Sequence, residues 1–338
     1  MKKLLVLLLA SLFIFAACSN GNSKPDEPEQ TPASTSTETS TSSSTGGGST
    51  GGSGGEEGNN QGGETIVTRT EVSGKIGKYG SPYEVGDIIF NDGSAIPYTT
   101  QLTLTDEQKA SAIAVIFYKG NELNNGEDTK IRSLGVGFKH GTNLQWCRVY
   151  QYYDELDECF KLFVANAYYK EITTIQCTDG SVWNNELQCL IPKVNSGDKD
   201  GSDNLEQISE FLSAEDRGTT DDTGIPANYP AFYYAKNYKD SVTNITGTEY
   251  ETGWYLPSYA ELLKIYENGK SRFKLFDLNV VSNLCGGDTF DEETYYWSSS
   301  QFEPYEDNIR GYLCRFGGDW GGSCKDAPSN ACAIREFN

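Results

Sequence analysis

The cysteines are the residues of this chain whose type and spacing point most directly to chemistry. Eight of them follow Cys18: Cys147, Cys159, Cys177, Cys189, Cys285, Cys314, Cys324 and Cys332. An even number of cysteines in an exported chain favours disulfide bonds, although spacing alone does not choose among the possible pairings. No two of them have the Cys-x-x-Cys spacing, so the sequence gives no indication of a structural zinc site.

His140 is the only histidine, and it decides which catalytic units are possible. Ser-His-Asp and Cys-His nucleophilic units both need a histidine as the general base. Because His140 lies between Lys139 and Gly141, we expect it to be a loop residue. The sequence therefore predicts a protein that is not an enzyme and that uses no cofactor.

Three carboxylates with alternating spacing, Asp198, Asp200 and Asp203, could in principle bind calcium, which takes oxygen ligands. The pattern departs from the EF-hand loop, because no glycine follows Asp203 and no glutamate closes the loop. We expect a solvated turn that leads into a helix cap, and no metal site.

The first eighteen residues have the composition of an export signal. Lys2 and Lys3 precede an apolar run from Leu4 to Phe15, and two alanines stand directly before Cys18. A basic start, a short apolar segment and small residues describe a signal peptide, and a cysteine after the small pair is typical of bacterial lipoproteins. The sequence thus predicts a signal peptide over residues 1–17, and a lipid on Cys18 that anchors the protein in the outer membrane at the cell surface.

Composition then divides the mature chain. Residues 18–65 are mainly Ser, Thr, Gly, Pro, Glu and Asn, which predicts a disordered stalk because such a segment buries too little apolar surface to fold. Residues 66–338 are long enough for one large domain. The net charge of −21 and the lack of a basic cluster exclude nucleic acid as a partner.

Local patterns within 66–338 predict both strands and helices. Strands are expected over 85–90, 112–118 and 134–138, with a turn at 91–93. Helices are expected from Asp203 with Glu206 as its cap partner, over 229–238 with Pro230 in the first turn, and from Ser258 with Glu261 in a capping box. Short strands should follow Phe276. We therefore predict an α+β class with two or three helices and short antiparallel strands.

Several segments in a fixed order resemble exported bacterial proteins. GWYLPSYAELLKIY (Gly253 to Tyr266), YYWSSSQ (Tyr295 to Gln301) and ACAIREFN (Ala331 to Asn338) resemble the C-type-lectin-like superfamily, which includes formylglycine-generating-enzyme-like domains. Further segments are more similar to spirochaete variable surface lipoproteins, and these are VGDIIFNDGS, LGVGFKHGTNLQWC, ITTIQC, GDKDGSDN and YPAFYYAKNYKD. The insert from Val149 to Tyr169 has no counterpart.

This resemblance implies a C-type-lectin-like fold whose last strands and loops present a ligand-binding surface. In several such proteins a retroelement diversifies this segment, which here corresponds to about 301–330, with Trp320 and Lys325 expected as fixed framework. Aromatic side chains and arginines are natural centres of binding energy, with polar neighbours adding specificity. The expected ligand-binding residues are Phe302, Tyr305, Arg310, Tyr312, Arg315, Asp319, Trp320, Ser323, Asp326, Ser329 and Asn330.

The resemblance also implies roles for framework residues and cysteines. Trp254, Trp297 and Arg335 are expected in the framework, and the pairs Cys285–Cys332 and Cys147–Cys177 match framework cysteines. Cys159 and Cys189 would then lie near the insert and could pair, whereas Cys314 and Cys324 would be diversified positions.

The predicted function is a surface lipoprotein that binds a protein or glycan ligand outside the cell through a diversified C-terminal surface. The alternative is a fixed calcium-dependent glycan-binding lectin or adhesin, although no Glu-Pro-Asn or Trp-Asn-Asp string occurs. A formylglycine-generating oxidase ranks below both, because Cys324 and Cys332 are spaced more widely than the copper-binding cysteines of those enzymes.

Overall fold

The structure is a computed structural model that describes residues 69–338 apart from 181, 185–188, 192, 215–219, 271–275 and 303–307. The described residues belong to one unit that begins at Thr68. The predicted signal peptide, the lipid attachment site Cys18, the stalk over 18–65 and the candidate binding residue Tyr305 lie outside the described residues.

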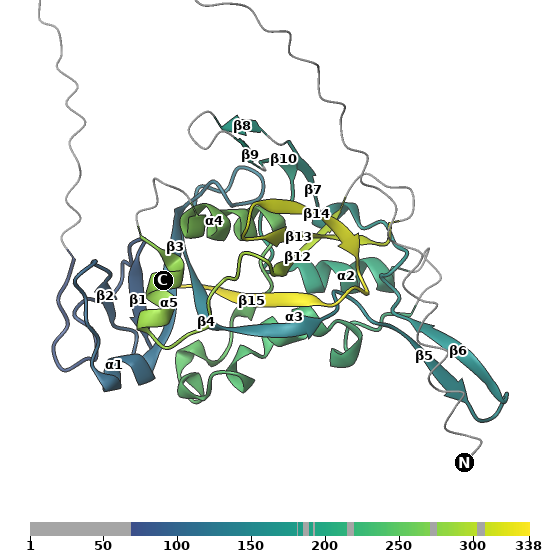
Figure 1. Ribbon diagram of the computed structural model, residues 1–338, viewed down its shortest axis with the longest axis horizontal. Coiled ribbons are helices and arrows are strands. Elements are labelled where there is room, and N and C mark those ends of the chain that lie inside the picture. Colours follow the sequence, from purple (N-terminus) through teal and green to yellow (C-terminus); the bar gives the residue numbers. More distant parts are fainter. Residues whose placement is uncertain are drawn as a thin grey trace, which may run out of the picture. The chain divides into compact units, whose positions relative to one another are not determined.

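Strands are more numerous than helices in the described domain (Figure 1). They are β1 (Asp87–Phe90), β2 (Ala95–Pro97), β3 (Ala112–Gly120), β4 (Arg132–Leu144), β5 (Val149–Asp154), β6 (Cys159–Val164), β7 (Gln176–Asp179), β8 (Val182–Asn184), β9 (Cys189–Ile191), β10 (Val194–Gly197), β11 (Trp254–Tyr255), β12 (Tyr295–Phe302), β13 (Arg310–Arg315), β14 (Asp319–Cys324) and β15 (Ser329–Glu336).

Eleven of these strands form one mixed sheet in the order β10-β7-β12-β15-β4-β3-β1-β2, with β11 beside β15 and the β13–β14 hairpin beside β12. Most neighbours are antiparallel, whereas β12 runs parallel to both β15 and β7. β3 lies between β1 and β4, and its residues from Ala112 to Tyr118 are all buried. A strand covered on both faces reads as a continuous apolar run, which is the pattern of this segment.

Five α-helices accompany the sheet in the described part of the chain, and they have 6–12 residues each. They are α1 (Asp106–Ser111), α2 (Asn204–Ser213), α3 (Pro230–Lys236), α4 (Tyr259–Lys270) and α5 (Leu278–Leu284). Short 3-10 turns lie at Thr173–Ile175, Pro226–Asn228, Tyr238–Asp240, Thr243–Ile245 and Glu249–Glu251.

The prediction of an α+β, C-type-lectin-like fold is wrong. The domain is a large mixed β-sheet with few, short helices. Sequence motifs determine local elements, but they do not determine how strands from both ends of a chain pair. Here β15, at the C-terminal end, pairs with β4 and β12 and completes a single sheet.

The three predicted helices are nevertheless confirmed as elements. Ser258 and Glu261 form the expected capping box before α4, with Ser258 N donating to Glu261 Oε2 over 2.8 Å and Glu261 N donating to Ser258 Oγ over 3.2 Å. Pro230 stands at the first position of α3. Asp203 precedes α2 but makes no cap hydrogen bond with its side chain, and instead accepts one from Gln207.

His140 lies in β4, so the prediction of a loop position is wrong. Its backbone N–H donates to Asp288 Oδ2 over 2.9 Å, and its Nδ1 lies 2.9 Å from the hydroxyl of Tyr296. Its ring packs 4.4 Å from the ring of Phe290. Burial lowers the pKa of His140 to about 4, because an imidazolium would lose hydration there. His140 is thus a neutral packing residue at neutral pH.

Side chains alternate along the central strands between two apolar clusters, one on each face of the sheet. The first cluster contains Trp254 and Trp297 together with residues of α2 and α3, and the second contains residues of α4 and α5. Trp297 is fully buried, and Arg335 donates to the carbonyls of Thr252 and Glu249. The framework roles predicted for these residues are confirmed.

The predicted disulfides are not formed, because Cys147, Cys285 and Cys332 are free buried thiols. Cys147 packs in the first cluster and Cys177 in the second, so these two side chains face opposite sides of the sheet. Cys159 is exposed, and the side chain of Cys189 lies outside the described residues. Burial raises the pKa of Cys147 and of Cys285 to about 12, so both thiols stay protonated at neutral pH.

The unmatched insert forms the β5–β6 hairpin, which extends away from the large sheet at the lower right of Figure 1. Large apolar side chains are exposed on it, including Tyr153, Leu156, Phe160 and Leu162. No helix in the described part of the chain is long and apolar enough to cross a membrane.

Candidate functional site

The residues predicted to bind ligand lie mainly on the β13–β14 hairpin and at the start of β15. β13 pairs with β14 from Arg310 opposite Cys324 to Arg315 opposite Asp319. The connecting turn uses Gly318 with φ +102°, a conformation that side chains with a Cβ rarely adopt. The hairpin is joined to the large sheet through β12, so its position is fixed by the core.

A cavity of about 380 Å³ lies between this hairpin and the start of β15. We call it the C-terminal groove, and its lining residues are Tyr295, Leu313, Trp320, Gly321, Gly322, Ser323, Ala327, Pro328 and Ser329. Three of the predicted binding residues, Trp320, Ser323 and Ser329, are among them. None of the lining side chains is charged, so the groove offers hydroxyls, backbone groups and aromatic surface to a ligand.

Two predicted residues belong to the core of this region. Tyr312 is 1% exposed and stacks on Tyr259 with ring centroids 4.1 Å apart. The ring of Phe302 packs edge-on against Tyr312 at 4.5 Å, and a Cβ on Gly322 would lie only 2.5 Å from Phe302 Cγ. Tyr312 therefore supports the hairpin from below and does not reach its surface.

Two polar members of the predicted set hold neighbouring segments in place. Asp326 Oδ1 accepts from the hydroxyl of Tyr168 over 3.0 Å, and the carbonyl of Asp326 accepts from Gln145 over 2.8 Å. Asn330 forms a side-chain hydrogen bond with Tyr296. Both side chains thus have structural partners within the protein.

The predicted arginines differ in their surroundings. Arg315 makes an ion pair with Glu293 over 3.1 Å, and its guanidinium lies 5.7 Å from the ring of Tyr295, which lines the groove. Arg310 is half-buried on β13. The backbone of Asp319 begins β14 opposite Arg315, but its side chain lies outside the described residues.

Lys325 is fully buried, as its expected framework role requires. Its Nζ donates to the carbonyls of Ala167 over 2.8 Å, Tyr168 over 3.2 Å and Asn308 over 2.8 Å. A buried ammonium is tolerated only when its hydrogen bonds are satisfied. Lys325 therefore ties the β14–β15 connection to the rest of the domain.

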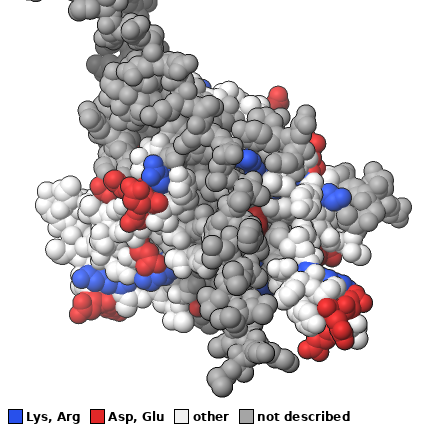
Figure 2. Space-filling view, turned by 45° about the vertical axis from the view of Figure 1, so that its right-hand side comes forward, with Lys and Arg blue, Asp and Glu red and all other residues white. Residues whose placement is uncertain are grey.

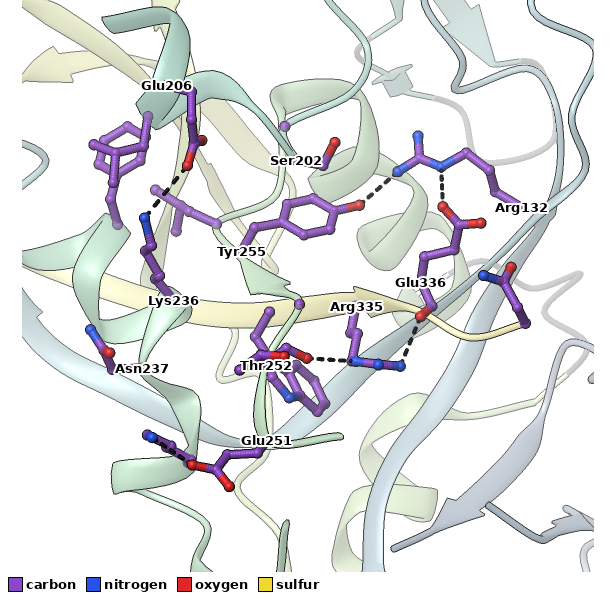
Figure 3. A pocket seen from close by; sticks show the side chains of 18 residues that line it. Arg132, Ser202, Glu206, Lys236, Asn237, Glu251, Thr252, Tyr255, Arg335 and Glu336 are labelled. Atoms are coloured by element: carbon purple, nitrogen blue, oxygen red, sulfur yellow. Dashed lines mark hydrogen bonds and ion pairs between the residues drawn. The ribbon is translucent and has the colours of Figure 1, made fainter. Parts of the chain in front are cut away.

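A second and larger cavity, of about 540 Å³, escaped the sequence analysis (Figure 3). We call it the Arg132 pocket. Its walls come from α2, α3, the segment from Glu251 to Leu256 that contains β11, and the end of β15. Buried apolar side chains form its floor, and they are Leu205, Phe232, Trp254 and Leu256.

Arg132 is the most constrained charged residue at this pocket, with only 4% of its side chain exposed. Its Nη1 lies 2.9 Å from Asp200 Oδ2, and its Nη2 lies 3.2 Å from Glu261 Oε1. Its Nε lies 3.5 Å from Glu336 Oε2, and the hydroxyl of Tyr255 accepts from Nη2 over 2.8 Å (Figure 3). One guanidinium thus holds three carboxylates that come from different segments of the chain.

Glu261 lies beneath Arg132 and connects the ion pairs to α4. Its Oε2 accepts from the backbone N–H groups of Gly201 and Ser258, and its Oε1 accepts from the hydroxyl of Tyr255. Burial and the neighbouring carboxylate of Asp200 raise the pKa of Glu261 to about 7, against the opposing effect of Arg132. Both carboxylate oxygens of Glu261 have partners inside the protein. We therefore interpret Glu261 and Arg132 as structural support for the pocket.

On the face drawn in Figure 2, the described residues form no broad basic area. In the view of Figure 2, red and blue side chains occur in small separate groups on the described part of that face. Within the described residues, no group of three or more His, Cys, Asp or Glu side chains could hold a metal ion. Asp198 accepts instead from the side-chain amides of Asn125 and Asn204.

Comparisons with known proteins give limited information. No protein-family model matches the sequence, and no curated protein matches it. Among solved structures, the chain is similar to a fimbrial protein from Bacteroides ovatus ATCC 8483, with a TM-score of 0.46 and 16% sequence identity. The match covers 75% of this chain and 49% of the fimbrial protein, so the chain spans about half of that protein's length. This likeness does not assign the chain to a family.

Proposed function

We propose that this chain is a lipid-anchored binding protein of the outer membrane and cell surface that recognises a protein or glycan ligand through the C-terminal groove. The single observation that supports this proposal is the convergence of Trp320, Ser323 and Ser329 on one cavity. These residues were expected to bind ligand from the sequence, and they lie on two different strands.

The chemistry of the groove is suited to recognition. Trp320 lines the groove, and tryptophan is a type of residue that often dominates binding energy. Ser323 and Ser329 supply hydroxyls that both donate and accept hydrogen bonds. Arg315 lies at the adjacent strand end and can form charge-assisted hydrogen bonds at the rim.

We further propose that the segment from about 301 to 330 is diversified between copies of the gene. Side chains that support the fold here, such as Tyr312 and Lys325, are buried beneath the groove. The side chains that line or flank the groove, such as Ser323 and Ser329, are partly exposed. Substitutions at the partly exposed positions would change the ligand and leave the supporting contacts intact.

The test uses the purified full chain in detergent micelles on arrays of extracellular proteins and glycans. For any ligand found, Trp320→Ala should weaken binding by about tenfold or more, because an aromatic contact of roughly 2 kcal/mol is removed. Tyr169→Ala is the matched control, since Tyr169 is an exposed aromatic residue that does not line the groove. Equal binding by both variants would contradict the proposal.

A further inference from the structure

The Arg132 pocket shares no lining residue with the C-terminal groove, so its chemistry can be judged separately. Its volume of about 540 Å³ falls in the range of roughly 300–1,000 Å³ that is typical of small-molecule sites. The apolar floor and the polar rim are also typical of such sites.

Apart from Arg335, which makes no ion pair within the described residues, the charged side chains that line the pocket each have a partner of opposite charge. Lys236 lies 3.5 Å from Glu206 across the gap between α3 and α2, and Lys239 lies 2.6 Å from Glu251. Figure 3 shows these pairs on one side of the pocket, with Arg132 and Glu336 on the other. An ionic ligand would have to displace the opposite charge with which each of these side chains already pairs. A net charge on the ligand would therefore add little to its affinity.

Each nitrogen of the Arg335 side chain donates a hydrogen bond to a backbone carbonyl. Its Nε donates to the carbonyl of Thr252 over 2.8 Å, and its two terminal nitrogens donate to the carbonyls of Glu336 and Glu249. Its guanidinium lies 4.8 Å from the ring of Tyr250. It therefore braces the wall of the pocket, and three of its five N–H groups are already used within the protein.

The uncharged polar groups of the rim have spare hydrogen-bonding capacity. Within the described part of the chain, no hydrogen bond uses the hydroxyl of Ser202 or of Thr252. Asn237 donates through its amide nitrogen to the carbonyl of Tyr233, which leaves its amide oxygen as an acceptor at the rim. Each ion pair of the rim also presents a donor and an acceptor side by side.

From this arrangement we infer that the Arg132 pocket binds a neutral, polyhydroxylated ligand, which in chemical class is a short uncharged oligosaccharide. Neighbouring hydroxyls of a sugar both donate and accept, so they match rim groups of both kinds without displacing an ion pair. The apolar floor, of which Leu205 keeps 9% and Phe232 4% of its surface exposed, suits the C–H surface of a sugar ring. This inference does not depend on the proposed function of the groove.

The first experiment uses the full chain on an array of defined oligosaccharides, some neutral and some sialylated or sulfated, followed by calorimetry with each neutral glycan retained. Neutral glycans should bind, and their Kd should be nearly independent of salt, because no net charge is neutralised. Binding of acidic glycans alone, or of none, would overturn the inference.

Two variants then locate the site. Ser202→Tyr, in the turn before α2, places a ring in the mouth of the pocket and should abolish binding, whereas Glu210→Tyr, on an exposed position of α2, should leave it unchanged. Thr252→Val removes one hydroxyl at constant shape and should weaken binding by about tenfold. Thermal unfolding of each variant shows whether the fold is retained.

The outcomes separate this site from the C-terminal groove. Glycan binding that is lost in Ser202→Tyr and kept in Trp320→Ala would support the Arg132 pocket, whatever the groove binds. Glycan binding that is unchanged in both Ser202→Tyr and Thr252→Val would overturn the inference. Loss of glycan binding in Trp320→Ala alone would overturn it too, and would place the glycan in the groove.

Discussion

The two cavities of this domain are built in opposite ways. The C-terminal groove is lined by uncharged side chains and glycines on strands that rest on a buried aromatic layer. The Arg132 pocket is lined mainly by paired charges above an apolar floor, and on one side an arginine is held by carboxylates from distant segments. A surface of the first kind tolerates changes in its lining, whereas a surface of the second kind depends on each member of its ion-pair network.

The largest effect should come from the network beneath the pocket. Arg132→Met leaves the buried carboxylate of Glu261 without its cationic partner, and breaking a buried pair in this way costs about 3–5 kcal/mol. Urea unfolding of the variant at neutral pH measures this loss of stability. A cost below about 1 kcal/mol would show that the pocket does not depend on Arg132.

An effect of similar size should appear in the layer that carries the groove. Trp297 is fully buried and donates from its indole N–H to the carbonyl of Leu144 over 2.9 Å. Trp297→Ala should therefore destabilise the domain by about 3–5 kcal/mol and lower its melting midpoint by roughly 6–20 °C. Trp320→Ala, which truncates a groove residue, should keep a melting midpoint close to that of the unchanged protein, and equal losses in both variants would contradict the division between layer and lining.

A moderate effect should depend on pH through His140. The pKa of His140 is about 4 in the folded protein, below its usual 6.5, so the unfolded chain binds a proton more readily between these values. Stability due to this group is present above about pH 6.5 and decreases as the pH falls toward 4, by about 2 kcal/mol between pH 7 and pH 5. His140→Gln keeps a hydrogen-bonding group near Tyr296 and cannot titrate.

The difference in the free energy of unfolding between the original protein and His140→Gln isolates the contribution of His140 from that of Glu261. The raised pKa of Glu261 changes stability with pH in the opposite direction. Urea unfolding of both proteins at several pH values measures it. Parallel stability curves for the original protein and for His140→Gln would show that His140 is not held neutral by burial.

The smallest effect on stability is expected at the rim of the groove. Arg315 and Glu293 form an ion pair whose side chains are 29% and 83% exposed, and such pairs contribute about 0–1 kcal/mol. Arg315→Ala should thus hardly change the melting midpoint, but it should weaken binding of a groove ligand. The control is Lys78→Ala, which removes an exposed ion pair with Glu71 away from the groove. A melting midpoint that falls much further for Arg315→Ala than for Lys78→Ala would assign Arg315 to the framework.

The sequence predicted those parts of the molecule that depend on residues close together in the sequence. The capping box of Ser258 and Glu261 and the proline at the start of α3 are local signals, and both helices are present. The pairing of β15 with β4 and β12 depends on contacts between distant segments, which no local pattern encodes. The predicted fold class failed for this reason.

The candidate sites divide in the same way. Trp320 and the two serines were expected at a binding surface because the resemblance places that surface in the last strands and loops, and all three line one cavity. Tyr312 was misplaced because a tyrosine fits a binding surface and a β-sheet core equally well. Arg132 gave no signal, since its partners Asp200, Glu261 and Glu336 lie far away in the sequence and meet it only in the folded domain.

The most direct test of the C-terminal groove is to measure where variation is tolerated. Two libraries of the full chain are displayed on cells and sorted for folded protein. The first set of randomised positions is Arg315, Ser323 and Ser329, and the second set is Tyr312, Trp297 and Lys325. Our account predicts that the first set accepts most side chains and yields variants with new ligands, whereas the second set accepts almost none. Equal intolerance of the two sets would contradict the claim that the groove is a replaceable binding surface on a fixed layer.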